Sequence, residues 1–489
     1  MNEIVSAVEM KALEQAAFDR GVIEESLLEQ AGCGLARAIA ERWPEGGHLV
    51  VFAGKGHNAG DALVAARELK LSNQWSVEVR LAFDEPVLKP LVKATLAALI
   101  KLGGVKFASL EAPLVGGKVV LLDGLLGIGA EGELRDSIRA ACEQINRWRE
   151  TYFADVIAVD LPTGLGWENG VVADCTVTFG FPKSELLIDS ATARVGRLVV
   201  VPLPDLGQLL GAPRDFVITP EWIRRFLPKK RLFTTHKGEA GRVGIVAGSR
   251  GCIGAARLSA ASAVRTGAGL VTLFVPDEIY EVAATSVIPE VMVRTHRELS
   301  GFKADAWGIG PGLGAEIRKS VMAWMEELDA PAVIDADALN WIAQTGLCGL
   351  ESLSGKRLFT PHPGEMKRLL ANWRPELSDR SRAEQAGEFA RVYGHTLLLK
   401  GSRTIIADAG KPLAYNSTGT PAMASGGMGD VLTGICAALI GQGLQPFEAG
   451  AIGSWILGRA GEISSRRGIG ASYVIQEINA AFDCCRSAT

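Results

Sequence analysis

The sequence lacks the residue patterns that build disulfide frameworks and zinc centres. Its 489 residues include only six histidines and eight cysteines, and no two cysteines stand in a Cys-x-x-Cys arrangement. The scattered cysteines and histidines do not have the spacing of a structural zinc site. We therefore expect the cysteines to be reduced thiols, most of them small core residues, in a cytoplasmic protein. They are Cys33, Cys142, Cys175, Cys252, Cys348, Cys436, Cys484 and Cys485.

The net charge is also small, and long apolar runs are absent from the sequence. The formal net charge is −4 at pH 7, which gives no reason to expect a nucleic-acid or membrane partner. The longest apolar runs, such as Val119–Leu122 and Val431–Ile440, are too short or too interrupted to span a bilayer. Glu3 and Glu9 precede every lysine and arginine, which is not the pattern of a secretory signal. These absences favour a soluble protein that stays inside the cell.

The chain does have a regular alternation of short apolar runs and segments of helical period. A first alternation includes an expected helix at Asp61–Leu71, and a second one ends near an expected helix at Asp430–Ile440. Short buried strands separated by helices predict a parallel sheet covered on both faces, and so an α/β fold. The pattern lapses after Pro202, and the length suits two domains, which we expect at 1–216 and 217–489. Expected elements of the second domain include strand Leu270–Val275 and helix Arg382–Tyr393.

A glycine-rich loop leads into the expected helix at Asp430. Gly426, Gly427 and Gly429 come directly before Asp430, and the apolar residues after it have helical spacing. The unpaired N–H groups and the dipole of a helix start attract an anion. A carboxylate beside such an anion hole fits phosphoryl transfer, with Asp430 taking the proton of the attacking hydroxyl. From this loop alone, a tight turn with Asp430 as an ordinary N-cap explains the pattern equally well.

Three loops of the first domain follow expected strands and combine small residues with polar ones. They are Gly54–Asp61, Asp123–Gly129 and Asp160–Gly164. Ligands of parallel α/β sheets bind beyond the C-terminal strand ends, where these loops gather. Asn58, Asp123 and Thr163 carry short oxygen donors of the kind that a monovalent cation accepts. Asp61 either contacts a substrate or caps the helix that follows it.

Glycine also marks the loops of the second domain. Gly310–Gly314 follows an expected strand and opens a helix. Lys400–Thr404 joins two expected strands and offers small groups and an arginine where nucleotide phosphates would lie. His362 stands between two prolines that fix its direction, and we keep both a functional and a structural interpretation of it.

Together these motifs resemble one family, the two-domain NAD(P)H-hydrate repair enzymes, over almost the whole sequence. In the first domain Ser26–Gly32, Gly54–Asp61, Asp123–Gly127 and Asp160–Gly164 are similar to an epimerase domain. In the second, His236–Gly238, Gly251–Ala255, Arg265–Leu270, Gly310–Gly314, Asp335–Leu339, Pro361–Glu365 and Gly426–Asp430 are similar to a dehydratase domain. The resemblance implies a Rossmann-like three-layer sandwich followed by a ribokinase-like α/β domain.

The resemblance also implies two activities. The first domain would interconvert the R and S epimers of hydrated NADH or NADPH, with Asp160 as proton shuttle and potassium at Asn58, Asp123 and Thr163. The second domain would use ADP or ATP with Mg²⁺ to phosphorylate the S hydrate, because phosphate leaves more easily than hydroxide. Asp430 would be its base. The resemblance further implies a homo-oligomer, a tetramer or larger.

The site residues that follow from the resemblance fall into two sets. The hydrate would contact His57, Asn58, Ala59, Gly60, Asp61, Gly127, Ile128, Gly129, Asp160, Ala255, Gly312, His362 and Asp430. The nucleotide would contact Lys400, Gly401, Ser402, Arg403, Thr404 and Gly429.

This chain departs from the family at several positions: Thr163 stands where Ser is common, Met428 replaces a usual Thr, and Cys252-Ile253 replaces a Tyr-Thr pair. It reads His57-Asn-Ala-Gly-Asp-Ala62 where the family usually has Asn-Asn-Gly-Gly-Asp-Gly. Two other interpretations stay open. The chain would be a ribokinase-like small-molecule kinase with an accessory domain, or its first domain would serve only nucleotide binding or oligomerisation.

Overall fold

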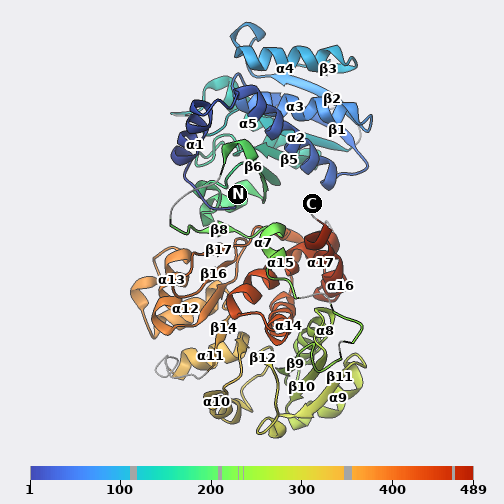
Figure 1. Cartoon of the computed structure of the whole chain (residues 1–489), viewed down its shortest axis with the longest axis vertical. Coiled ribbons are helices and arrows are strands. Elements are labelled where there is room, and N and C mark those ends of the chain that lie inside the picture. Colours follow the sequence, from blue (N-terminus) through green and yellow to red (C-terminus); the bar gives the residue numbers. More distant parts are fainter. Residues whose placement is uncertain are drawn as a thin grey trace. The chain divides into compact units, whose positions relative to one another are not determined.

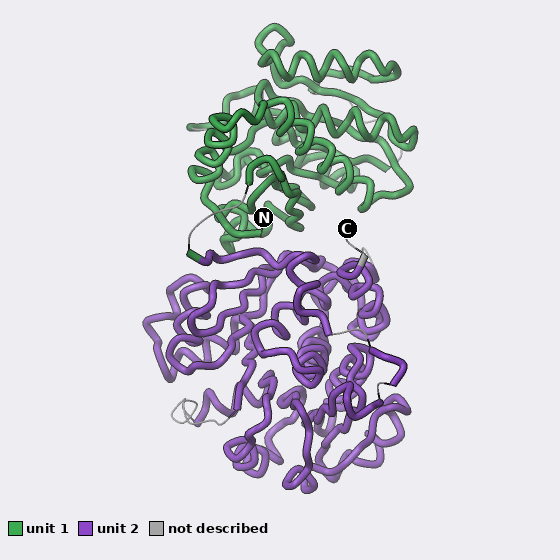
Figure 2. Tube along the Cα trace, in the orientation of Figure 1, with its two compact units in different colours: residues 1–212 green, residues 213–489 purple. Residues whose placement is uncertain are grey.

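The computed structural model divides the chain into two compact units, Met1–Ala212 and Pro213–Thr489 (Figures 1 and 2). It describes every residue except 1, 111–117, 131, 208–211, 229–230, 235, 346–354, 465–467 and 488–489, so Cys348 lies outside the described residues. The expected boundary at residue 216 is slightly late, because strand β8 (Phe216–Val217) pairs within the sheet of the second unit.

The first unit is built around a parallel sheet whose described strands run in the order β3-β2-β1-β4-β5-β6-β7. They are β1 (Gly47–Ala53), β2 (Trp75–Leu81), β3 (Val105–Phe107), β4 (Val119–Gly124), β5 (Asp155–Val159), β6 (Cys175–Phe179) and β7 (Arg197–Val201). Successive residues of β1 point to opposite faces. Leu49 and Val51 join the core on one face of the sheet, while Val50 and Phe52 join the core on the other. The sheet is therefore buried on both faces, as the continuous apolar runs predict.

Helices cover both faces of this sheet (Figure 1). They are α1 (Ala7–Asp19), α2 (Glu24–Arg42), α3 (His57–Leu71), α4 (Pro90–Lys101), α5 (Asp136–Thr151) and α6 (Thr192–Val195). A capping box of Ser6 and Glu9 starts α1, and Gly21, with φ of 94°, separates α1 from α2. Helix α3 begins at His57 with Gly56 as its N-cap, earlier than expected. Asp61 is thus inside the helix, and the interpretation of Asp61 as an N-cap is wrong.

The sheet of the second unit runs in the order β11-β10-β9-β12-β13-β14-β15-β16-β17-β8. Its strands are β9 (Arg242–Val246), β10 (Leu270–Val275), β11 (Val291–Thr295), β12 (Ala306–Ile309), β13 (Ala332–Ile334), β14 (Arg357–Phe359), β15 (Thr396–Leu399), β16 (Ile405–Ala407) and β17 (Ala414–Tyr415), with β8 at the edge. Neighbours from β11 to β15 are parallel, whereas β16 pairs antiparallel with both β15 and β17. The expected strand Leu270–Val275 is confirmed at both ends.

The helices of the second unit surround a buried central one, α14. They are α7 (Pro220–Arg224), α8 (Ile253–Arg265), α9 (Tyr280–Ser286), α10 (Arg318–Glu326), α11 (Ala336–Thr345), α12 (Pro363–Ala371), α13 (Arg382–Tyr393), α14 (Met428–Gly441), α15 (Pro446–Ser464), α16 (Ala471–Gln476) and α17 (Ile478–Ser487). Helix α14 packs closely on α8, because a Cβ at Gly434 would lie 2.1 Å from the Ser259 carbonyl oxygen. In the described part of the chain, no helix is both long and apolar enough to cross a bilayer.

The strand order of each sheet reverses at one place. The reversal lies between β1 and β4 in the first unit, and between β9 and β12 in the second. Crevices beyond the C-terminal strand ends at such points bind the ligands of open α/β sheets. The glycine-marked loops of the sequence lie at these ends.

Candidate active sites

Asp430 lies in the first turn of α14. The N-cap is Gly427, which has a left-handed φ of 95°, so the interpretation of Asp430 as an ordinary N-cap is wrong. A Cβ at Gly429 would lie 3.4 Å from Lys400 Nζ and 3.6 Å from Asp335 Oδ2. The glycines thus let the helix start come close to a buried ion pair.

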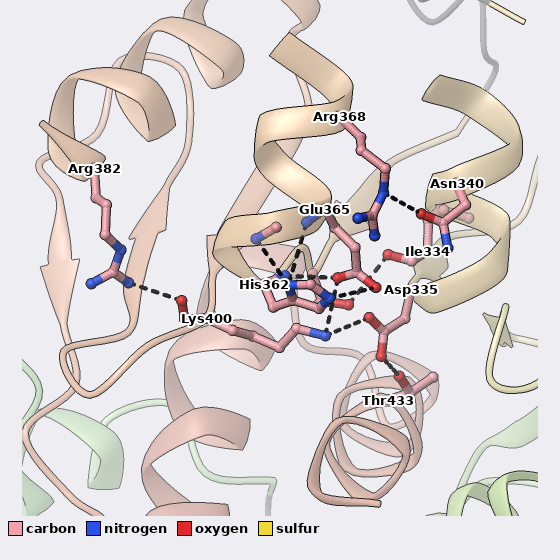
Figure 3. A network of polar contacts seen from close by, with 11 residues as sticks. Ile334, Asp335, Asn340, His362, Glu365, Arg368, Arg382, Lys400 and Thr433 are labelled. Carbon is pink, nitrogen blue, oxygen red and sulfur yellow. Dashed lines mark hydrogen bonds and ion pairs between the residues drawn. The ribbon is translucent and has the colours of Figure 1, made fainter. Parts of the chain in front are cut away.

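That ion pair joins Asp335, directly after β13, to Lys400, directly after β15 (Figure 3). Asp335 Oδ1 accepts a hydrogen bond from Lys400 Nζ at 2.7 Å, and Oδ2 accepts one from Thr433 Oγ1 at 2.8 Å. Glu365 Oε2 lies 3.7 Å from the same ammonium. Because Thr433 is on α14, one turn beyond Asp430, Asp335 ties the start of this helix to two strand ends.

Charges in this network shift the pKa of Asp430 toward neutrality. Burial and the nearby Asp335 carboxylate raise that pKa to about 6, while Lys400 opposes the shift. Burial lowers the pKa of Lys400, but the carboxylates of Asp335 and Glu365 outweigh it and raise that pKa overall. Asp430 is therefore mostly ionised at pH 7 and basic enough to accept a proton from a hydroxyl.

His362 has a structural role at the start of α12. Its Nδ1 accepts hydrogen bonds from the N–H groups of Gly364 at 3.0 Å and Glu365 at 3.3 Å. Glu365 Oε2 in turn accepts one from the His362 N–H at 2.7 Å, which completes a capping box. The side chain is 49% exposed and its Nε2 lies 3.5 Å from Glu365 Oε1, and the contact between His362 and substrate stays a prediction.

The structure brings the expected substrate loops together at the reversal of the second sheet. Gly312, with φ of 61°, comes so close to α8 that a Cβ there would lie 2.8 Å from Cys252 Cβ and 3.1 Å from Ala255 Cβ. A Cβ at Gly310 would lie 1.8 Å from the Asp335 carbonyl oxygen. Glycine at these positions allows the loop to pack between α8 and the strand end that holds Asp335.

The turn Lys400–Thr404 joins β15 to β16 as expected. Arg403 is only 3% exposed and its Nη1 donates to the Ser402 carbonyl, so its guanidinium is largely covered. Arg382 Nη2 donates to the carbonyl groups of Leu399, Lys400 and Arg403 and holds the turn in place. Gly401 and Ser402 are exposed. Nucleotide contact at this turn stays a prediction.

In the first unit, Asn58, Asp123 and Thr163 come together around the Leu126 carbonyl. The carboxylate of Asp123, which is 0% exposed, accepts from Thr163 Oγ1 at 2.7 Å and from the Thr163 N–H at 2.8 Å. The Leu126 carbonyl accepts from Asn58 Nδ2 at 3.0 Å. Burial raises the pKa of Asp123 to about 6. Among the described residues, no lysine or arginine is recorded in an ion pair with this carboxylate.

Asp160 follows β5 and has a left-handed φ of 65°, which is uncommon for a residue with a side chain. Its Oδ1 accepts from Lys183 Nζ at 2.6 Å, from Thr178 Oγ1 at 2.9 Å and from the Phe179 N–H at 3.3 Å. Lys183 is 1% exposed and thus forms a buried ion pair with Asp160. Strained backbone of this kind clusters at functional sites.

The loop with the unusual residues forms the first turns of α3. His57 is half exposed and contacts Glu24 and Lys89. Ala59 and Ala62 are both 0% exposed, and a Cβ at Gly124 would lie 2.6 Å from Ala62 Cβ. The two alanines therefore fill space between α3 and the sheet.

Asp61 is buried close to the Asp160 carboxylate. Burial, Asp160 and Glu14 raise the pKa of Asp61 well above its ordinary value, and Lys183 opposes this shift. Glu14, on α1, has its own pKa raised by burial and by Asp160. Two further acidic groups thus face the proposed proton shuttle.

Four polar residues of these sites were not among the predicted site residues: Glu14, Lys183, and the motif residues Asp335 and Glu365. Asp335 carried a usable signal, because it directly follows a buried strand as Asp123 and Asp160 do. Lys183 had none, since its pairing with Asp160 depends on the segment after β6 returning to the end of β5.

Comparison with known proteins covers both units. A sequence model described as "NAD(P)H-hydrate dehydratase" matches residues 243–480, and one described as "YjeF-related protein N-terminus" matches residues 24–185. A bifunctional NAD(P)H-hydrate repair enzyme of Moorella thermoacetica is 36% identical, covering 95% of this chain and 93% of that one. The protein of the same name from Coxiella burnetii is 34% identical, covering 94% of each chain.

A solved structure is also similar to part of the chain. It is the ADP/ATP-dependent NAD(P)H-hydrate dehydratase of Bacillus subtilis, co-crystallised with ATP and Mg²⁺. It is 28% identical, with a TM-score of 0.49, and the match covers 55% of this chain and 97% of that one.

Proposed function

Because this chain belongs to the family of bifunctional NAD(P)H-hydrate repair enzymes, we propose that Asp430 and Asp160 are the proton-transfer groups of its two activities. The second unit dehydrates the S hydrate of NADH or NADPH at Asp430. The first unit interconverts the R and S hydrates at Asp160, so that both epimers are repaired.

Dehydration proceeds by phosphorylation and elimination. Asp430 takes the proton of the C6 hydroxyl as its oxygen attacks the terminal phosphorus of ADP or ATP, which releases AMP or ADP. The lone pair of the ring nitrogen then expels phosphate from C6, and loss of a proton from C5 restores the reduced nicotinamide. The balance is hydrate plus ADP giving NAD(P)H, AMP and phosphate. Lys400, held by Asp335, supplies positive charge beside Asp430.

A Mg²⁺ ion would enter with the nucleotide. No group of three or more histidine, cysteine or acidic side chains with metal-site geometry occurs among the described residues. This fits Mg²⁺ that is held mainly by phosphates, with one or two carboxylates and water. The ion would neutralise phosphate charge.

Epimerisation needs only reversible loss of the C6 hydroxyl. The ring nitrogen expels it to form an iminium ion, and water returns to either face while Asp160 transfers the proton. Lys183 holds Asp160 Oδ1 at 2.6 Å, and Oδ2 is the oxygen that we propose to transfer the proton.

Potassium fits the cluster around Asp123, because a buried carboxylate, a hydroxyl and an amide oxygen of the first unit converge there. A Cβ at Gly127 would lie 3.0 Å from Asn58 Oδ1, so only glycine leaves this oxygen accessible. Assembly as a homo-oligomer stays a prediction from the resemblance.

The position of Asp430, between three glycines and the Asp335–Lys400 pair, supports the dehydratase proposal most strongly. The test is an absorbance assay of reduced nicotinamide with a mixture of R and S hydrates, Mg²⁺ and either ADP or ATP. Complete recovery of NADH or NADPH is the expected result. Accumulation of a phosphorylated hydrate would instead favour the small-molecule kinase, and recovery of the S form alone would favour a non-catalytic first unit.

A further inference from the structure

Asp61 is a buried carboxyl group without a hydrogen-bond donor in the protein. It lies on α3, one turn beyond the first residue of that helix, and is 8% exposed. Among the described residues, no side chain or N–H group donates to its carboxyl oxygens. Because buried polar groups are nearly always bonded within the protein, a buried carboxyl without a donor indicates a functional role.

The neighbouring lysine has no proton to offer to Asp61. Lys183 Nζ donates to Asp160 Oδ1 at 2.6 Å, to the Phe179 carbonyl at 2.9 Å and to Thr178 Oγ1 at 3.0 Å. An ammonium group has three protons, and these three bonds occupy all of them. Lys183 therefore stabilises a negative charge on Asp160 and leaves the Asp61 carboxyl without a donor.

Asp61 and Asp160 are thus expected to differ in protonation. A second ionised carboxylate beside Asp160, buried and without a donor, is strongly disfavoured. Burial, and then the charges of Asp160 and Glu14, raise the pKa of Asp61 well above its ordinary value, against the effect of Lys183. A neutral carboxylic acid beside an ionised carboxylate has the parts of a general acid and a general base.

The two aspartates reach the reversal of the first sheet from different elements. Asp61 belongs to α3, which follows β1, and Asp160 directly follows β5. Only β4 lies between β1 and β5, so the ends of these two strands are roughly 10 Å apart. This spacing suits a planar ring with one carboxyl group on each of its faces.

Epimerisation requires proton transfer on both faces of the nicotinamide ring. When the C6 hydroxyl leaves, the iminium ion is planar, and inversion occurs only if water returns to the opposite face. A carboxyl group that the protein holds on one face reaches water on that face alone. One proton-transfer group therefore supports exchange of the C6 oxygen with water, whereas inversion needs two.

We propose that Asp61 is the second proton-transfer group of the epimerase and acts on the face of the ring opposite to Asp160. The inference rests on the proposed function of the first unit and extends it. As the C6–O bond breaks, the lone pair of the ring nitrogen forms the C=N bond, and Asp61 gives its proton to the departing hydroxyl, which leaves as water. Another water attacks C6 from the other face and passes its proton to Asp160. Return of the proton to Asp61 through water resets the pair, and in the reverse direction the two groups exchange roles.

The experiment follows oxygen exchange and inversion together in the full-length enzyme. Pure R or pure S hydrate is incubated in water labelled with heavy oxygen, without nucleotide so that no dehydration occurs, and the spontaneous rates are subtracted. The wild-type enzyme should label both epimers as it interconverts them. Asp61→Asn should interconvert them about a hundredfold more slowly, yet label one epimer at a rate within about tenfold of wild type, because Asp160 still acts on its own face.

Two further variants complete the test. Asp160→Asn should label only the other epimer, because Asp61 then acts alone, and this result depends on Asp61 without altering it. Asp84→Asn is the matched control, since it makes the same change at an exposed carboxylate between β2 and α4, and it should keep both rates. Circular dichroism checks that each variant is folded.

Several outcomes would overturn the inference. They are normal interconversion by Asp61→Asn, equal loss of label from both epimers in a folded Asp61→Asn, and absence of label from both epimers in Asp160→Asn. Labelling of a single epimer by Glu14→Gln instead of Asp61→Asn would assign the second group to Glu14. Normal interconversion by Asp160→Asn beside a slow Asp61→Asn would refute only the proposed role of Asp160 and keep Asp61 as a proton-transfer group.

Discussion

The pH dependence of dehydration is a direct test of Asp430 as the base. Only the ionised carboxylate accepts a proton, so activity should rise with pH through its pKa of about 6. With this pKa, about nine tenths of Asp430 is ionised at pH 7 and about one tenth at pH 5. We therefore expect kcat/KM for the S hydrate to fall by about tenfold between pH 7 and pH 5.

The assay is the initial rate of NADH formation from pure S hydrate at saturating nucleotide, with folding at each pH checked by circular dichroism. Asp430→Asn should lower the rate by about a hundredfold or more at pH 7, because the amide keeps the shape and loses the base. Asp335→Asn removes the main negative neighbour of Asp430, so any residual activity should show its midpoint at a lower pH. A flat profile between pH 5 and pH 7, or near-normal turnover by Asp430→Asn, would refute the assignment.

Three further predictions concern the first unit and the division of the chain. Asp123→Asn should weaken epimerisation and its dependence on potassium while dehydration of S hydrate continues; equal rates in potassium, sodium and lithium for the wild-type enzyme would count against the cation site. Lys183→Met removes the ammonium group that lies 2.6 Å from Asp160 Oδ1, so the rate of conversion of R to S hydrate should fall by about a hundredfold. Normal conversion by a folded variant would make Lys183 a purely structural residue. A fragment of residues 213–489 should melt at a higher temperature than a fragment of residues 217–489. The shorter fragment lacks Phe216 of β8 and the hydrogen bond, 2.8 Å long, that the Leu413 N–H donates to Asp215. Equal melting temperatures would show that β8 contributes little to the stability of the second unit.

The fold was predictable where the apolar period is strong. Helix Arg382–Tyr393 has the expected bounds, because Ser381 and Glu384 form a capping box at its start and Gly394 ends it. Helix α5 was omitted from the interpretation, although Ile138, Ala141, Cys142 and Ile145 have the spacing of a helix face. The starts of α3 and α14 were placed too late. In both helices the first turn contains glycine and other small residues, which in the sequence suggest a loop. These residues are small because neighbouring elements lie too close to the first turn for larger side chains.

The site residues divide in the same way. Asp160, Asp123 and Asp430 follow strands or glycine loops, so sequence position identified them as candidates. Lys183 and Lys400 acquire their roles through pairing with carboxylates that are distant in sequence. Lys400 was expected to contact nucleotide, and its bond to Asp335 Oδ1 depends on the order β13-β14-β15. Strand order of this kind is a tertiary property that local spacing does not contain.

The two proposed proton-transfer groups differ in their surroundings, and the difference suits their reactions. Asp430 is not directly bonded to Lys400, which is held at 2.7 Å by Asp335, so the Asp430 carboxylate keeps a pKa of about 6 and remains basic. Asp160 bonds directly to its lysine, and one of its oxygens is fixed by three donors. A base that takes a hydroxyl proton during phosphoryl transfer must compete for that proton. A group that passes a proton back and forth as water leaves and returns must be orientated the same way in both directions, which is what the Lys183 bond secures.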